Sequence, residues 1–359
     1  MLHAMIMAGG SGTRFWPQSR RQLPKQFLRM TGDQTLIQQA TGRCQPAIAP
    51  EQTWIVTGAA HAVETARQLP HVPAHQILVE PCGRNTAPCI GLAAIAMLAS
   101  DPDAIMLVTP ADHVISPNEK FQQAVEQAVG LIEKEPSTLV LFGIEPTYPS
   151  TGFGYIQRGE RIPTTSCPTF RVKSFQEKPN EPTAAKFMAT GEYYWNCGIF
   201  VWRAQTILDA LKEFSPDIAA CLDRIRPGIG SEKLQTLLET EFPKMPSISI
   251  DYAVLEKATG RVCVLEAPFK WDDVGSWQAL PRLLTADPQG NTLDGNCCAV
   301  DTKGCIVRSN DDHLIATIGV TDLIIVHTST ATLVADKRDE NAIKVLIAEI
   351  GKQGLDRYL

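Results

Sequence analysis

The chain has 359 residues, of which 20% are charged and 44% are hydrophobic, and its formal net charge is -6. This mildly negative balance, without a run of basic residues, argues against nucleic acid as a main partner. No charged leader precedes an apolar segment and no stretch of about 18 apolar residues occurs, so we expect a cytoplasmic protein without a membrane partner. The length predicts one large domain with a smaller one attached. The 10 cysteines include no Cys-x-x-Cys pair, which predicts reduced thiols.

The first predicted strand, residues 3–7, runs into a glycine-rich segment. Three glycines at 9–12 let main-chain N–H groups approach an anion without interference from a Cβ atom, and Arg14 and Lys25 add positive charge. The segment lacks the Lys-Ser/Thr pair of a Walker loop, and Phe15 stands where a dinucleotide fingerprint needs its third glycine. The pattern predicts a phosphate-binding loop of another kind. A tight turn in which glycines merely supply positive φ is the plainer alternative.

Short apolar runs alternate with helical patterns up to residue 145, which is typical of repeated strand–helix–strand units. Strands are predicted at 54–57, 76–80, 104–109 and 138–143, and helices at 36–43, 60–68, 87–98 and 119–134. Continuously apolar strands predict an α/β fold with a Rossmann-like, mostly parallel sheet flanked by helices. Ligands of such sheets bind beyond the carboxyl ends of the strands.

The rest of the chain divides into a lobe over the sheet and a C-terminal part. Strands are predicted at 154–157, 171–175, 198–202 and 262–266, with helical periodicity at 204–238 and a short helical turn at 250–257, and the core is expected to close near 277–284. These segments complete a first domain at 1–286. After a turn, a β-rich domain at 287–359 is predicted from brief strands at 297–300, 305–308, 314–318, 323–327 and 332–335 and a helix at 340–350.

Two carboxylate positions are candidates for binding a divalent cation. Asp112 follows the strand 104–109 and so lies past a carboxyl end of the sheet, where a Mg²⁺ ligand for a bound triphosphate belongs. The alternative is a helix cap, but the next predicted helix begins nearer residue 117. A second carboxylate comes from Asp272 or Asp273, between which the residues alone do not decide.

Polar residues after two other strands can bind a phosphorylated sugar. Glu177 and Lys178 follow a strand, and a lysine there can screen one anionic substrate from another, although an isolated Glu-Lys-Pro sequence is more typical of an exposed turn. Gly154 lets a sugar ring approach the main chain, and the amide of Asn196 offers a donor and an acceptor to neighbouring hydroxyls. The structural alternatives are a β-bulge glycine and a turn asparagine.

Two segments carry polar residues at predicted helix starts. Glu80 ends a strand, and Asn85 or Thr86 can cap the helix that follows. Asp251 begins the short helical turn near 250, and we interpret it as an N-cap outside the site.

The motifs together resemble those of a known family. GGSGTRFWP at 9–17, followed by PKQF at 24–27, resembles the signature of the sugar-1-phosphate nucleotidyltransferases. The fuller form, with EPCGRNTAP at 80–88 and the segment 246–256, is similar to the mannose-1-phosphate guanylyltransferase branch. The resemblance covers most of the chain and implies a nucleotide-diphospho-sugar transferase fold. It also implies a C-terminal domain like a left-handed β-helix that supports a homodimer.

The resemblance implies a role for each candidate residue. It assigns nucleotide binding to Ala8, Gly9, Gly10, Gly12, Thr13, Arg14, Glu80, Asn85, Thr86 and Ala87. It assigns sugar-phosphate binding to Gly154, Glu177, Lys178 and Asn196. It assigns metal binding to Asp112 and to Asp273, the aspartate directly before a Val-Gly pair. The implied catalytic cations are Arg14, Lys25 and Lys178.

By this resemblance the chain transfers GMP from GTP to α-D-mannose 1-phosphate with Mg²⁺ or another divalent cation, giving GDP-mannose and pyrophosphate. Three alternatives stand beside it. The first is the same reaction class with another pair of substrates, such as glucose 1-phosphate and UTP. The second is a non-catalytic regulatory paralogue, against which the intact charged positions argue. The third is a nicotinamide-dependent oxidoreductase, against which the missing glycine argues.

Overall fold

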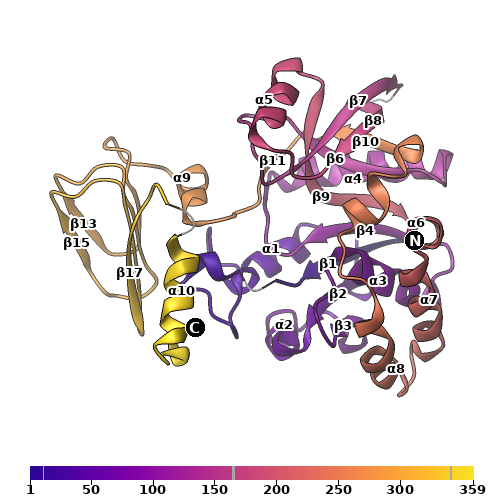
Figure 1. The fold of residues 1–359 in the computed structure, drawn as a ribbon, viewed down its shortest axis with the longest axis horizontal. Helices are drawn as coiled ribbons and strands as arrows, with labels where there is room; N and C mark the ends of the chain where they lie inside the picture. The colour runs from indigo at the N-terminus through magenta and orange to yellow at the C-terminus, as the bar shows by residue number, and fades with distance from the viewer. Residues whose placement is uncertain (11, 164–165, 340–341) are drawn as a thin grey trace. The chain divides into compact units, whose positions relative to one another are not determined.

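The computed structural model describes residues 1–10, 12–163, 166–339 and 342–359 (Figure 1). The chain forms two compact units, which we call the first unit (1–9, 40–111 and 115–271) and the second unit (10–39, 112–114 and 272–359). This division differs from the predicted boundary at residue 286, because two early segments, 10–39 and 112–114, pack with the C-terminal part of the chain.

A nine-stranded sheet forms the centre of the first unit, in the order β3-β2-β1-β4-β9-β6-β10-β8-β7. Its strands are β1 (Leu2–Ala8), β2 (Thr53–Gly58), β3 (Ile77–Glu80), β4 (Ile105–Pro110), β6 (Leu139–Ile144), β7 (Gly154–Ile162), β8 (Thr169–Gln176), β9 (Tyr193–Arg203) and β10 (Val262–Glu266). Strands β1 to β4 pair in parallel, as do β6 and β10. Strands β8 and β9 run against their neighbours. The predicted α/β fold is confirmed, but the sheet is mixed rather than mostly parallel, because β9 is inserted antiparallel between β4 and β6 and β7 and β8 also pair antiparallel.

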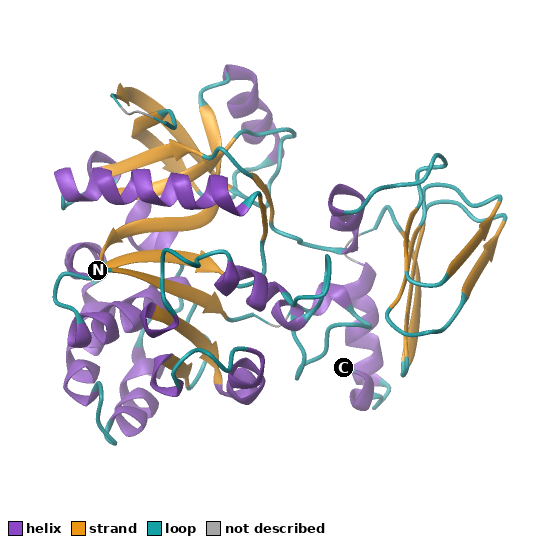
Figure 2. Cartoon of the chain, turned by 180° about the vertical axis from the view of Figure 1, so that it is seen from behind, coloured by secondary structure: helices purple, strands orange, loops and turns teal. Residues whose placement is uncertain are grey.

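Helices cover both faces of this sheet (Figure 2). The helices up to residue 271 are α1 (Leu36–Gly42), which begins in the second unit, and α2 (Ala62–Gln68), α3 (Thr86–Ser100), α4 (Asn118–Lys134), α5 (Glu181–Thr190), α6 (Ala204–Phe214), α7 (Pro216–Ile225) and α8 (Leu234–Glu241). Leu141 of β6 belongs to the apolar cluster that contains α3, whereas Phe142 contacts Phe269, which contacts Phe121 of α4. Because successive strand residues point to opposite faces, α3 and α4 cover opposite faces.

The second unit is built from brief strands and the early segment 10–39. Its elements are η1 (Thr13–Phe15), η2 (Lys25–Phe27), α9 (Leu280–Leu283), β12 (Thr292–Asp294), β13 (Cys297–Val300), β14 (Ile306–Ser309), β15 (Ile315–Ile318), β16 (Leu323–Thr328), β17 (Ala331–Asp336) and α10 (Ala342–Lys352). Strands β12, β14 and β16 pair in parallel in one sheet and β13 and β15 in another, so the chain alternates between two sheets as in a β-helix. Phe15 packs edge to face on Trp277 with ring centroids 5.1 Å apart. The predicted β-rich domain that ends in a helix is confirmed.

The sequence pattern missed some elements and merged others. It gave no indication of α5, of β12, or of β5 (Val114–Ser116) and β11 (Lys270–Asp272), which pair in a small sheet of their own. The helical stretch 204–238 is broken where Pro216 begins α7, because a proline cannot continue the hydrogen bonding of the preceding helix. The predicted helix at 340–350 includes two positions outside the described residues. No helix in the described part of the chain has the length and apolar character needed to cross a membrane.

Candidate active site

The glycine-rich turn of the second unit packs against Lys25. Gly12 has a φ of 52°, and a Cβ atom on it would lie 2.5 Å from the main-chain nitrogen of Lys25. Only glycine therefore fits at this position. The side chain of Lys25 is 8% exposed, and its Nζ donates to Oδ2 of Asp112 at 2.8 Å and to the main-chain oxygen of Asp273. Three residues predicted from distant parts of the sequence thus come together.

The structure distinguishes Asp272 from Asp273. The carboxylate of Asp272 accepts a hydrogen bond from the main-chain N–H of Val274 at 2.8 Å and pairs with Arg282. Val274 has a φ of 46°, a conformation that a β-branched residue adopts only when its surroundings hold it there. Asp272 therefore stabilises a strained turn, which leaves the carboxylate of Asp273 for a ligand. This arrangement favours Asp273 as the metal-binding residue, as the family resemblance implies.

Arg14 is exposed and lies just after Gly12 of the glycine-rich turn. A Cβ atom on Gly275 would lie 2.9 Å from Oδ2 of Asp273 and 3.5 Å from Nη1 of Arg14, so both charged groups border one small space. We call Arg14, Lys25, Asp112 and Asp273 the charged cluster. It contains two cations and two carboxylates, all within the second unit.

The two carboxylates of the charged cluster have opposite pKa shifts. Burial acts to raise the pKa of Asp112, but the Lys25 ammonium and His113 outweigh it, so that the pKa lies below the usual value. Burial raises the pKa of Asp273. The negative charges of Asp272 and Asp112 raise it further, whereas the positive charges of Lys25 and Arg14 act to lower it. The repulsion between these carboxylates would be relieved by a cation bound to both.

The donor set of the charged cluster fits a hard divalent cation. Carboxylate oxygens are the protein ligands that Mg²⁺ prefers, and one or two of them usually suffice because substrate phosphates and water complete the coordination. Within the described residues, no group of three or more histidine, cysteine or carboxylate side chains is placed to hold a metal. A cation here would thus depend on its substrate for the remaining ligands.

The nucleotide-binding candidates of the first unit lie at the carboxyl ends of strands. Ala8 ends β1, and its carbonyl oxygen accepts a hydrogen bond from Thr57. Asn85 has a φ of 66° and caps α3, since its Oδ1 accepts the N–H of Thr86 at 2.8 Å. Ala87 is fully buried and its N–H donates to the carbonyl oxygen of Ile248, so its main chain already has a partner. The alternative of a helix cap is thus realised at Asn85, which remains exposed for a ligand.

Glu80 ends β3 as a buried carboxyl group. It is 8% exposed, and its Oε1 has no hydrogen-bond partner among the described residues. Burial raises its pKa to about 7, although a hydrogen bond from Cys89 works against the shift. A buried acceptor without a partner carries a free-energy cost that a ligand donor could remove.

Gly9 and Gly10 present open main chain, as the phosphate-binding prediction requires. A Cβ atom on either would meet nothing within 4 Å, and Gly10 has a φ of 101°. Thr13 is the first residue of η1, and Gly12, at the N-cap position, has no side chain that could cap the turn. Ser11, between Gly10 and Gly12 in the sequence, lies outside the described residues.

Glu177 and Lys178 meet Gly154 in the first unit. Nζ of Lys178 lies 2.9 Å from Oε1 of Glu177, and this hydrogen bond raises the pKa of the lysine above its usual value. Lys178 has a φ of 44°, so its turn is a strained one, and its side chain is 58% exposed. A Cβ atom on Gly154 would lie 2.4 Å from Oε2 of Glu177, so any other residue there would force this carboxylate to move.

Asn196 and Asp251, which was not predicted to belong to the site, complete this group. Nδ2 of Asn196 donates to Oδ1 of Asp251 at 2.8 Å, and its Oδ1 accepts the N–H of Gly198 at 3.2 Å. Glu256 accepts the main-chain N–H of Glu177 at 2.9 Å. From the sequence, Asp251 is interpreted only as a helix cap. The signal that could have shown its place in this group is a second acidic residue five positions later, Glu256. We call Gly154, Glu177, Lys178, Asn196 and Asp251 the sugar cluster.

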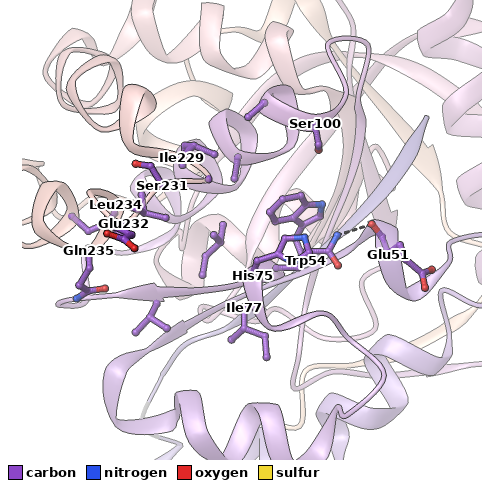
Figure 3. A pocket seen from close by; sticks show the side chains of 17 residues that line it. Glu51, Trp54, His75, Ile77, Ser100, Ile229, Ser231, Glu232, Leu234 and Gln235 are labelled. Carbon is purple, nitrogen blue, oxygen red and sulfur yellow. Dashed lines mark hydrogen bonds between the residues drawn. The ribbon is translucent and has the colours of Figure 1, made fainter.

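A large hollow of about 780 Å³ in the first unit lies away from these residues (Figure 3). Trp54, at the start of β2, and Ile77, at the start of β3, line it together with Ser100 at the end of α3. These positions are at the amino ends of the strands, and no predicted site residue lines the hollow. Its size therefore does not make it the reaction site, because parallel sheets bind substrates at the carboxyl ends of their strands.

Comparison with known proteins identifies the family. A model of the nucleotidyl transferase family matches residues 3–289. The chain belongs to the nucleotidyl transferase family. A second model, of the MannoseP isomerase/GMP-like beta-helix domain, matches residues 295–350, in agreement with the alternating sheets of the second unit. The oxidoreductase alternative is thereby set aside.

Several relatives of this nucleotidyl transferase are similar to it over nearly its whole length. It is 38% identical over 98% of its length to mannose-1-phosphate guanylyltransferase ManC of Salmonella typhimurium, of which it covers 74%. It is 38% identical over 98% of its length to alginate biosynthesis protein AlgA of Pseudomonas aeruginosa, of which it covers 72%. A crystal structure from Thermus thermophilus, described as a mannose-1-phosphate geranyltransferase, matches with a TM-score of 0.86 and 32% identity, with 98% of this chain and 99% of that chain covered. Membership of the mannose-1-phosphate guanylyltransferase branch is confirmed.

Proposed function

We propose that the chain transfers GMP from GTP to α-D-mannose 1-phosphate, which gives GDP-mannose and pyrophosphate. The observation that carries the proposal is the charged cluster, in which Lys25 links Asp112 to the main chain of Asp273 beside the glycine turn. Cations, carboxylates and open main chain together suit a triphosphate that arrives with a divalent cation. The choice of guanine and mannose is supported by relatives named mannose-1-phosphate guanylyltransferase.

The reaction is an in-line displacement at phosphorus. An oxygen of mannose 1-phosphate forms a bond to the α-phosphorus of GTP, and the bond from that phosphorus to the bridging oxygen breaks, so pyrophosphate leaves with the electron pair. No protein base is required, because a phosphate monoester has a second pKa of about 6 and is mostly dianionic at neutral pH. The protein supplies position and positive charge. Arg14 and Lys25 stabilise the leaving pyrophosphate, and Lys178 holds the attacking phosphate.

Asp112 and Asp273 would hold Mg²⁺ or another divalent cation. The support is the donor set itself, two carboxylates of which one raises the pKa of the other. When bound, Mg²⁺ supplies positive charge to the phosphate oxygens. Asp272 contributes indirectly, since it fixes the turn from which Asp273 extends.

Glu80 is proposed to select the guanine base. Guanine carries two N–H groups side by side on one edge, and a carboxylate can accept both. The unpartnered Oε1 of Glu80 at the end of β3 supports this role, as does the exposed Asn85 that begins the next helix. Adenine lacks this pair of donors.

We also propose a homodimer that works in the cytoplasm, with neither nucleic acid nor a membrane as partner. The β-helix-like second unit supports the dimer through the family resemblance. The 10 free cysteines suit a reducing compartment. Light scattering coupled to size-exclusion chromatography tests the assembly, and a mass of one chain at micromolar concentration would contradict the dimer.

The deciding experiment measures pyrophosphate release with Mg²⁺ for GTP, ATP, UTP and CTP, each combined with mannose, glucose and N-acetylglucosamine 1-phosphates. We expect a clear preference for GTP with mannose 1-phosphate and a loss of about 10²–10³-fold in Asp112→Ala. Activity with another pair would keep the reaction class and overturn the substrates. No turnover with any pair would favour the regulatory paralogue.

A further inference from the structure

The segment from Ile250 to Glu256 contacts both the nucleotide-binding candidate Thr86 and the sugar cluster. It contains η8, a π-helical turn at Asp251–Leu255, whose main-chain hydrogen bond runs from the N–H of Glu256 to the oxygen of Asp251 at 3.0 Å. Just before this turn, the N–H of Ile250 donates to the hydroxyl of Thr86 at 2.8 Å. Turns of the π-helical kind are rare in proteins, and those that do occur are often at functional sites.

The two acidic ends of this turn each hold a residue of the sugar cluster. Oδ1 of Asp251 accepts from the side-chain amide of Asn196, and Oε1 of Glu256 accepts from the main chain of Glu177. The carboxylate of Asp251 also lies close enough to that of Glu177 for the two charges to repel each other, which is unfavourable in the folded protein. Burial and the charge of Glu177 raise the pKa of Asp251 to about 6, against the opposing effects of a hydrogen bond from Ser249 and of the Lys178 charge.

We propose that Asp251 is a positioning residue that fixes the amide of Asn196 in the orientation that binds the sugar hydroxyls of the sugar 1-phosphate. This inference rests on the proposed function and concerns its sugar-binding step alone. A carboxylate only accepts hydrogen bonds, so it holds the NH₂ end of the amide and repels the oxygen end. With Gly198 bound to the oxygen, one N–H and one lone pair of Asn196 remain, side by side, for a pair of hydroxyls.

The test compares Asp251→Ala with the wild-type enzyme in steady-state kinetics with GTP and mannose 1-phosphate. Loss of one hydrogen bond to a charged group predicts that kcat/KM for the sugar phosphate falls about 10- to 100-fold. The KM for GTP should change less than about twofold, because the bond to Asn196 belongs to the sugar step. An unchanged KM for the sugar phosphate in an active variant overturns the inference, whereas an inactive wild-type enzyme overturns the proposed function as well.

A double-mutant cycle separates positioning from a direct contact. If Asp251 acts through Asn196, adding Asp251→Ala to the Asn196→Ala variant should lower kcat/KM for the sugar phosphate by less than about threefold. Equal costs in both backgrounds overturn the inference. The matched control is Asp287→Ala in the second unit, which also removes a carboxylate bound to an asparagine amide, at 2.9 Å from Asn291, and should leave kcat/KM within about twofold.

Asp251→Asn keeps the shape of the side chain and serves if the alanine variant does not fold. An asparagine can accept from Asn196 or donate to it, so it no longer fixes the amide. We expect kcat/KM for the sugar phosphate to fall about tenfold at pH 8. The ratio of wild-type to variant kcat/KM cancels the ionisation of the substrate. This ratio should approach one below pH 6, where Asp251 gains a proton, and a ratio that stays constant with pH contradicts the proposed role.

Discussion

Asp112 of the charged cluster and Asp251 of the sugar cluster are carboxylates in opposite surroundings. Asp112 lies beside the Lys25 ammonium, which lowers its pKa against the effect of burial. Asp251 lies beside another carboxylate and bonds to a neutral amide, and its pKa is raised to about 6. In the proposed function, the first surroundings hold an anion ready for charged ligands, whereas the second use an anion to orient hydrogen-bonding groups toward the uncharged hydroxyls of the sugar phosphate. The two halves of the proposed reaction thus depend on different physical interactions.

The largest effect should come from removing charge from the charged cluster. Asp273→Asn keeps the shape but removes the negative charge that faces the metal and phosphates, so we expect kcat to fall about 10²–10³-fold. Asp272→Asn is the control beside it. An amide oxygen can still accept from the N–H of Val274, so this variant should lose less than about tenfold. Equal losses in the two variants would show that the roles of the two aspartates are wrongly assigned.

The glycine turn offers a second comparison, within the phosphate-binding segment. Gly12→Ala forces a Cβ atom to 2.5 Å from the main chain of Lys25 at a φ of 52°, which should lower the free energy of unfolding by about 2 kcal/mol. Gly9→Ala meets nothing within 4 Å, so it should keep its stability and raise only the KM for GTP. Denaturant titration and GTP kinetics on both variants check this contrast. A stable Gly12→Ala enzyme would mean that the packing of Lys25 tolerates the shift.

A smaller effect is expected in the sugar cluster from Gly154→Ala. The added Cβ atom would lie 2.4 Å from Oε2 of Glu177, so that carboxylate must move, and we expect the KM for mannose 1-phosphate to rise about tenfold with the KM for GTP unchanged. Gly152→Ala is the matched control, since its nearest neighbour would be Oγ of Ser150 at an ordinary 3.6 Å. A rise in both KM values would indicate a general disturbance of the fold instead.

Local patterns in the sequence pointed to three members of the charged cluster but did not decide between Asp272 and Asp273 for the fourth. The glycines, Arg14 and Lys25 stand within one short segment, and Asp112 follows an apolar strand, so periodicity and residue chemistry located them. Most strand and helix positions followed from the same periodicity. The division into units did not, because the packing of residues 10–39 with the C-terminal part depends on contacts between distant segments.

The sugar cluster shows where such patterns fail. Asn196 and Asp251 are far apart in the chain, and only the structure brings the amide to the carboxylate. The predicted N-cap was wrong, because Ile250 stands at the N-cap of the turn and the carboxylate of Asp251 bonds to the amide of Asn196. The antiparallel insertion of β9, which carries Asn196, likewise depends on tertiary pairing with β4 and β6.

The smallest effect concerns Glu80, whose buried carboxyl group is comparable to Asp251 rather than to Asp112. Its pKa is raised from 4.5 to about 7 in the folded protein, so between these values the folded state binds more protons than the unfolded state. Stability must therefore fall as pH rises through this window. Glu80→Gln removes the effect, and its stability relative to the wild type should increase by the order of 1 kcal/mol from pH 5 to pH 8.

The control for this pH dependence is Glu64→Gln. A hydrogen bond from Arg67 lowers the pKa of Glu64 against the effect of burial, so its stabilising contribution is lost only below pH 5 and the variant's cost should stay constant between pH 5 and pH 8. Urea titrations at several pH values measure both variants. A constant difference for Glu80→Gln would mean that Glu80 is already ionised and solvated in the folded protein. It would then lack the desolvated acceptor proposed for guanine, and the parallel with Asp251 would end there.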